Sequence, residues 1–230
     1  MTPSSPQRSP PPGPRLPRGV RVAALVCFVL SSLTLFRSLQ DLVLLAHLGE
    51  LRDYASRPAS AARELPSGLD PEVERRALEA QVSALEPMRE PRALILVGLA
   101  GACFLCIGAA GHLLRRAGML PREGMRQLLG RAALAAAFLR TVDGAQLAVV
   151  WRRMGTVGAE LMDRMPGFAD LKDPALAEQV RTAMPAFFSA AAVVHTALVA
   201  GLFLLLAQYF RSERVRALVA AQEPQLGRDA

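Results

Sequence analysis

The sequence predicts an all-α polytopic membrane protein, in which a bundle of four transmembrane helices carries two short extracytoplasmic amphipathic helices. The chain is 52% hydrophobic and only 5% aromatic over its 230 residues, and four long apolar stretches are separated by arginine-bearing segments. A helix needs about 20 residues to cross a bilayer. In lipid, only helices and closed barrels satisfy their own backbone polar groups. The stretches are too long for tilted barrel strands, so we expect helices.

Four membrane spans are predicted from these stretches. They are placed at about residues 22–45, 93–114, 132–151 and 186–210, within a membrane domain over 21–210. The second and fourth stretches contain no Asp, Glu, Lys or Arg, whereas the third contains two charges and is the weakest of the four. The number of crossings supports the third span, because with only three spans the basic C-terminal tail would lie outside.

The distribution of arginine predicts the orientation. Residues 115–131 hold five Arg and one Glu, whereas the connection 46–91 holds six Arg against nine acids. The connection 152–185 is balanced, with five basic and five acidic residues. Cytoplasmic loops of membrane proteins carry the excess of Lys and Arg. We therefore expect both termini to be cytoplasmic and both of these connections to be extracytoplasmic. An Arg-, Ala- and Gly-rich composition is typical of a GC-rich bacterial genome, which places the chain in a bacterial inner membrane.

The two ends of the chain are predicted to be cytoplasmic tails. The first 21 residues contain seven Pro, four Arg and no acid, a composition that cannot bury enough apolar surface to fold. We expect a disordered tail over residues 1–20 and a second tail over 211–230. The net charge of +7 does not indicate nucleic-acid binding, because the arginines flank the spans and form no stripe interleaved with aromatic residues.

Each outside connection is predicted to contain a short helix. Asp70 precedes Pro71 at the start of a helical pattern that runs to Leu85, and Asp173 precedes a second pattern over 174–184. Asp as N-cap with Pro at the first helical position is a typical helix start. A proline follows each run before the next span.

The two halves of the chain resemble each other. Glu79–Pro87 is similar in sequence to Ala177–Pro185, and each follows an Asp-Pro pair. One interpretation is a tandem repeat of a helix–loop–helix unit, a common arrangement in membrane proteins. The other is chance matching between segments rich in Ala, Arg and Leu.

Arg140 and Asp143 are the main candidate polar site. They lie about 8 and 11 residues into the third span, three residues apart and so on one helix face. A charge at that depth costs roughly 2.5–3.5 kcal/mol on insertion scales and normally faces the bundle interior. The pair could carry ions or protons or contact an anionic substrate. The favoured interpretation is a buried ion pair that fixes the helix register.

His195 and the pair Arg37 and Asp41 are further candidates. His195 lies about ten residues into the fourth span, so a contact with Asp143 is possible on depth alone. Arg37 and Asp41 are four residues apart near the outer end of the first span, where an interfacial pair is expected. The three histidines of the chain do not place two at one depth, so no haem site is predicted.

The three cysteines are predicted to have packing roles. Cys27, Cys103 and Cys106 all fall inside spans, and thiols in apolar surroundings are inert. A Cys-x-x-Cys pair is used by some membrane thiol oxidoreductases, but those also need exposed relay cysteines. Redox chemistry is therefore not favoured.

The sequence favours a non-enzymatic role. It contains no P-loop, no His-Glu-x-x-His, no Gly-x-Ser-x-Gly and no clustered metal ligands, so no catalytic residue, cofactor or metal is assigned. The first hypothesis is a structural or assembly component of a membrane complex. Its partners would be the lipid bilayer and a protein partner or further copies of the chain. The alternative is a small transporter or channel subunit that uses Arg140, Asp143 and His195.

Overall fold

The computed structural model describes residues 17–55, 71–115, 122–162 and 173–221. Within these ranges almost every residue is helical and no strand is present, so the predicted all-α class is confirmed. The tail predicted over residues 1–20 lies outside the described residues, except that the first helix already begins at Arg18.

Four helices are long and apolar enough to cross a membrane, as predicted. They are α1 (Arg18–Ala46), α4 (Arg89–Leu114), α5 (Arg122–Glu160) and α6 (Pro174–Arg211). Each predicted span lies inside one of them. α5 has 39 residues and α6 has 38. At 1.5 Å per residue each is about 58 Å long, well beyond the ~30 Å hydrocarbon layer.

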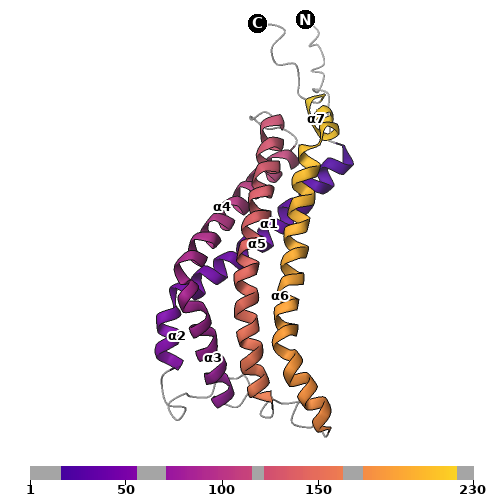
Figure 1. Ribbon diagram of the computed structural model, residues 1–230. Coiled ribbons are helices and arrows are strands. Elements are labelled where there is room, and N and C mark those ends of the chain that lie inside the picture. The colour runs from indigo at the N-terminus through magenta and orange to yellow at the C-terminus, as the bar shows by residue number, and fades with distance from the viewer. Residues whose placement is uncertain (1–16, 56–70, 116–121, 163–172, 222–230) are drawn as a thin grey trace, which may run out of the picture.

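The four long helices run alternately up and down the bundle (Figure 1). α5 packs along α6, α4 packs on α5, and α1 packs on α4, whereas α1 and α6 have little contact. Near the start of α1 the two helices do approach, since a Cβ on Gly19 would lie 3.2 Å from the Tyr209 hydroxyl. α7 (Glu213–Ala220) follows α6 at this end. We call it the α7 end and the opposite end the α3 end.

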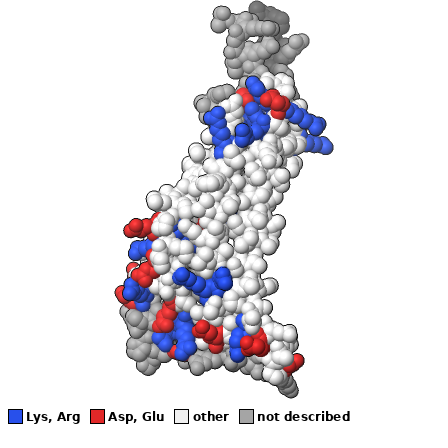
Figure 2. Space-filling view, in the orientation of Figure 1, with Lys and Arg blue, Asp and Glu red and all other residues white. Residues whose placement is uncertain are grey.

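Charged side chains gather at the two ends of the bundle on the face shown in Figure 2, with a belt of uncharged residues between them. Many large apolar side chains on the long helices are exposed in the isolated chain. The most exposed of these are Leu33, Phe36, Leu94, Phe104, Phe138, Phe187, Leu198 and Leu205. Such a surface is stable when it faces hydrocarbon, so the charge-free belt is the part that lipid would surround.

Small residues let α5 approach α6 closely. A Cβ on Gly144 would lie 2.0 Å from the side chain of Thr196, and one on Gly155 would lie 2.7 Å from the Cα of Pro185. Glycine at both positions is therefore required by the space available. Small residues at helix interfaces are the usual means of close packing in a bilayer.

The second expected outside helix is not a separate element. The sequence predicts a break at Pro185, but α6 runs without interruption from Pro174 to Arg211. Proline inside a helix removes one backbone hydrogen bond and usually ends or kinks it. Here the backbone at Pro185 lies close to Gly155 of α5, and the helix continues through the proline. The predicted cap is present, since the Asp173 carboxylate accepts a hydrogen bond of 2.9 Å from the Ala175 N–H.

The first expected outside helix is present as α3 (Pro71–Leu85). A one-turn 3₁₀ helix, η2 (Glu86–Met88), separates it from α4 and contains the expected proline break. Helical spacing predicts one apolar stripe on this helix, at Val73, Leu78, Val82 and Leu85. Leu78 is half-buried, the other three are buried, and Glu79 is exposed. α3 packs against α2 (Leu48–Ala55) and α5. The two helices that begin with an Asp-Pro pair therefore differ in structure. α3 ends just before Pro87, whereas α6 continues through Pro185.

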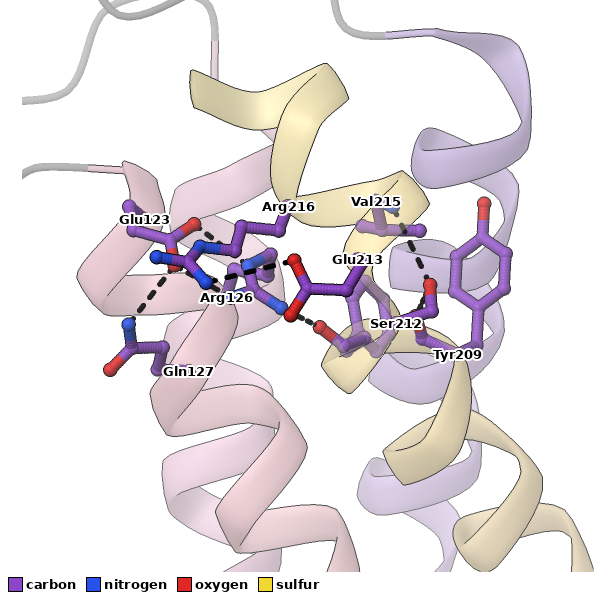
Figure 3. A network of polar contacts seen from close by, with 9 residues as sticks. Glu123, Arg126, Gln127, Tyr209, Ser212, Glu213, Val215 and Arg216 are labelled. Carbon is purple, nitrogen blue, oxygen red and sulfur yellow. Dashed lines mark hydrogen bonds and ion pairs between the residues drawn. The ribbon is translucent and has the colours of Figure 1, made fainter.

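A polar network fixes the α7 end (Figure 3). Arg126 of α5 donates one hydrogen bond to the backbone carbonyl of Phe210 in α6 and another, of 2.6 Å, to Glu123. Its guanidinium lowers the pKa of Glu123 to about 2, so this carboxylate stays ionised at physiological pH. The Ser212 hydroxyl caps α7 by accepting from the Val215 N–H at 3.4 Å. The start of α5 is thus tied to the end of α6.

Candidate intramembrane polar site

Asp143 is the centre of the buried polar site. It lies on α5 and has no exposed surface. Its Oδ2 is 2.5 Å from Nη1 of Arg140, one turn earlier on the same helix. Its Oδ1 is 3.3 Å from Nη2 of Arg92, which comes from α4. The ion pair expected between Arg140 and Asp143 is therefore present, and a second arginine completes it.

Arg92 is the residue that sequence reasoning missed. It is only 2% exposed, and its Nη2 also lies 3.1 Å from Oδ2 of Asp41 on α1. One guanidinium thus bridges two carboxylates from different helices. The sequence does contain one indication of this contact, namely the predicted depth of Arg92 in the membrane. Asp41 lies four residues before the end of the first predicted span and Arg92 directly before the second, so antiparallel helices bring them together.

Arg37 completes the network at its exposed edge. Its Nε is 3.6 Å from Oδ1 of Asp41, and its side chain is 62% exposed, so this contact is weak. The expected interfacial pair Arg37–Asp41 is present, but Asp41 is held mainly by Arg92, at 3.1 Å. The two ion pairs that the sequence suggested belong to one network of five charged side chains, which joins α1, α4 and α5.

The network is not balanced in charge. Three guanidinium groups face two carboxylates, which leaves one positive charge without a counter-charge among these five side chains. Several buried donors also have no hydrogen-bond partner among the described residues, namely Nε and Nη1 of Arg92 and Nε of Arg140. A buried donor without a partner costs about 1–3 kcal/mol. The site therefore has unused capacity for an acceptor.

His195 does not contact Asp143. Its neighbour Thr196 is the residue that faces α5, at Gly144, and successive helix positions are rotated by about 100°. This rotation turns His195 out of the α5–α6 interface, and its side chain is exposed. It lines a cavity together with Arg140. His195 and Asp143 lie at a similar depth, because their neighbours Thr196 and Gly144 face each other. The rotation of α6 about its axis nevertheless separates the imidazole from the carboxylate.

Two cavities border the network. One, of about 430 Å³, lies between α1, α5 and α6 and is lined by Arg37, Asp41, Leu147, Trp151, Phe188, Ala191, Ala192, Arg140 and His195. We call it the arginine cavity. A smaller one, of about 140 Å³, is lined by Arg37, Asp41 and Arg92 with apolar residues of α1, α3 and α5. Asp143 is not among the residues that line either cavity.

A third and larger cavity, of about 540 Å³, lies at the α3 end between α3, α5 and α6. Its walls are almost entirely apolar, with Met154, Val157, Met184 and Phe187 among the lining residues. We call it the apolar cavity. It shares Trp151 and Phe188 with the arginine cavity, and these two rings stack with centroids 5.8 Å apart.

The cysteines belong to the buried apolar core that α1 and α4 share with α5 and α6, and none of them forms part of the charged network. Cys27 of α1 and Cys103 and Cys106 of α4 are all fully buried free thiols. They pack among alanine and leucine side chains, as expected for packing residues. Within the described part of the chain, no group of three or more His, Cys, Asp or Glu side chains could hold a metal ion.

Comparison of the chain with models of protein families, with curated proteins and with solved structures finds no match.

Proposed function

We propose that this chain is a non-enzymatic, multi-pass membrane protein that acts as a structural or assembly component of a membrane complex. The observation that carries the proposal is that the Asp143 side chain is buried and paired with arginines. Its side chain has no exposed surface, and both of its oxygens face arginines, one from its own helix and one from α4. A carboxylate that carries ions or protons needs a hydrated approach, whereas one that locks helices together needs to be dry and paired.

The outer faces of the bundle support an assembly role. A Cβ on Gly101 or Gly108 of α4 would meet no atom within 4 Å, so these small residues do not serve packing inside the chain. They lie seven residues apart on the exposed side of α4. Small residues on a lipid-facing helix side allow a second helix to approach closely. A protein partner or a second copy of the chain would dock there.

The proposed location is a bacterial inner membrane, with the α7 end on the cytoplasmic side. The excess of arginine in residues 115–131 supports this orientation through the positive-inside rule. α3 and the first turns of α6 would then lie on the extracytoplasmic side. A tandem repeat of two helical hairpins would pair α1 with α4 and α5 with α6; both contacts are present, together with a contact between α4 and α5 of similar extent to that between α1 and α4, and duplication remains our interpretation of the sequence similarity.

The abundance of charge variants in the membrane tests the structural role of Asp143. Asp143→Asn leaves two buried arginines with Asp41 as their remaining carboxylate, and breaking a buried pair costs about 3–5 kcal/mol. We expect this variant to accumulate poorly. Arg140→Leu with Asp143→Leu removes one charge of each sign and leaves Arg92 paired with Asp41, so abundance should largely return. Quantitative immunoblotting of membrane fractions measures both.

A small transporter or channel subunit is the second candidate function, and the arginine cavity favours it because Arg140 and His195 both line that cavity. The same variants distinguish the two. If Asp143→Asn accumulates at the wild-type level but alters proton or ion flux in reconstituted vesicles, the structural proposal is wrong and the transport hypothesis gains.

A further inference from the structure

The arginine cavity has the features of a ligand site for an acidic group. It lies between α1, α5 and α6, where α1 has little contact with α6. Arg140 lines it with a side chain only 7% exposed, and the Nε of this arginine has no hydrogen-bond partner among the described residues. Arg37 reaches the cavity from α1 and His195 from α6. Donors from three helices therefore converge on one space.

The charge of the site fits a single negative charge. The network of Arg37, Asp41, Arg92, Asp143 and Arg140 holds three cations and two anions. A monoanion in the cavity would balance this excess beside the guanidinium groups of Arg37 and Arg140. A cation is disfavoured there for the same reason.

The neighbouring apolar cavity fits the rest of such a ligand. It adjoins the arginine cavity at the stacked rings of Trp151 and Phe188, and its volume is about 540 Å³. Its apolar lining offers no site for a charged group but would exclude water around a hydrocarbon chain. A ligand that occupies both spaces must carry an acidic group and an apolar chain.

We propose that the arginine cavity and the apolar cavity together bind an anionic amphiphile, with its acidic group at Arg37 and Arg140 and its hydrocarbon chain beyond Trp151. The acidic group is a carboxylate or a phosphodiester, as in a fatty acid or an anionic phospholipid. The bilayer itself supplies such molecules. This site is independent of the assembly role proposed above, and either proposal can fail without the other.

Trp151 makes the proposal directly measurable, because it is the single tryptophan of the chain and lines both cavities. Bromine on an acyl chain quenches tryptophan fluorescence at short range. The full-length protein in neutral detergent is titrated with a brominated fatty acid and with its methyl ester. A brominated phosphatidylglycerol and a brominated phosphatidylcholine form the second comparison. We expect saturable quenching by an anionic probe at a mole fraction at least about tenfold below that of its neutral counterpart.

The two anionic probes identify the source of the ligand. Preference for the fatty acid over its ester assigns a carboxylate, and preference for phosphatidylglycerol over phosphatidylcholine assigns a phospholipid headgroup. Equal quenching by charged and neutral probes in both comparisons would overturn the proposal.

Matched variants locate the site. Arg37→Gln removes the excess positive charge from an exposed side chain and should weaken quenching by the anionic probe about tenfold. Arg152→Gln removes an exposed charge next to Trp151 that does not line the cavity, and should have no effect. Ala191→Phe leaves every charge in place but fills the arginine cavity, and should abolish saturable binding. Unchanged affinity in both Arg37→Gln and Ala191→Phe would exclude this cavity.

Discussion

At the scale of single residues, Arg92 is the side chain that joins the two ion pairs which the sequence draws attention to. Its guanidinium contacts Asp41 and Asp143 at 3.1 and 3.3 Å, and so joins α1 to α5 through α4. Three cations with two anions also make the network asymmetric. Removal of one cation leaves two balanced pairs, whereas removal of one anion leaves two surplus positive charges.

This asymmetry predicts different costs for two single substitutions. Arg92→Leu leaves the pairs Arg37–Asp41 and Arg140–Asp143, so we expect it to destabilise the chain by about 1–3 kcal/mol, mainly through lost hydrogen bonds. Asp41→Leu leaves Arg92 and Arg140 sharing Asp143 and should cost about 3–5 kcal/mol. Thermal unfolding in detergent, followed by circular dichroism, compares the two. Equal losses, or a larger loss for Arg92→Leu, would show that charge balance does not govern this site.

Arg92 shows which contacts of this site could not be predicted from the sequence. Arg140 and Asp143 could be found because their spacing within one helix places them together. Arg92 and Asp41 come from different helices, and their contact depends on the crossing of α1 and α4. His195 was matched to Asp143 by depth, but depth does not determine the rotation of a helix about its axis. Thr196 occupies the inward position instead.

At the scale of elements, the interface between α5 and α6 depends on two glycines with different neighbours. Opposite Gly144 is the side chain of Thr196, including its Cβ at 2.6 Å, whereas opposite Gly155 is the backbone at Pro185. At the same contact α6 continues through Pro185. The local sequence predicts a break there, because the packing of α5 against the proline is not encoded in the segment itself.

The Gly155 contact yields a prediction for α6. Gly155→Ala places a methyl group 2.7 Å from the Cα of Pro185, so the two helices must separate. Overpacking of this kind costs typically about 1–3 kcal/mol. The melting temperature in detergent should fall. Gly101→Ala is the matched control, because open space surrounds Gly101 and alanine favours a helix by about 1 kcal/mol over glycine. A melting temperature for Gly155→Ala that equals that of the control would contradict this packing.

At the scale of the whole molecule, the features predicted best are those set by one stretch of sequence. The four apolar runs gave the four long helices, and Asp173 with Pro174 gave the start of α6. The order of packing, with α1 on α4 and α5 on α6, was not predicted, because apolar runs of similar composition do not specify their neighbours. The arginine cavity follows from that order, since it lies between α1, α5 and α6, where α1 and α6 have little contact.

The orientation of the bundle gives the last prediction. The helices alternate in direction, so the start of α1, the end of α4, the start of α5 and the end of α6 share one end of the molecule. The sequence that links α4 to α5 is rich in arginine, with five Arg and one Glu in residues 115–131. Translocation of so many arginines is unfavourable, so we expect this end to face the cytoplasm.

Reporter fusions after residues 18, 122 and 225 should therefore report a cytoplasmic location, and fusions after residues 68 and 170 an extracytoplasmic one. The fusion at 170 is the most informative, because it follows α5, whose apolar stretch contains Arg140 and Asp143 and is the least hydrophobic of the four spans. A cytoplasmic signal at 170 together with an external C-terminus would mean that α5 does not cross the membrane. The charged network could then not lie in the bilayer interior, because Asp143 and Arg140 both belong to α5.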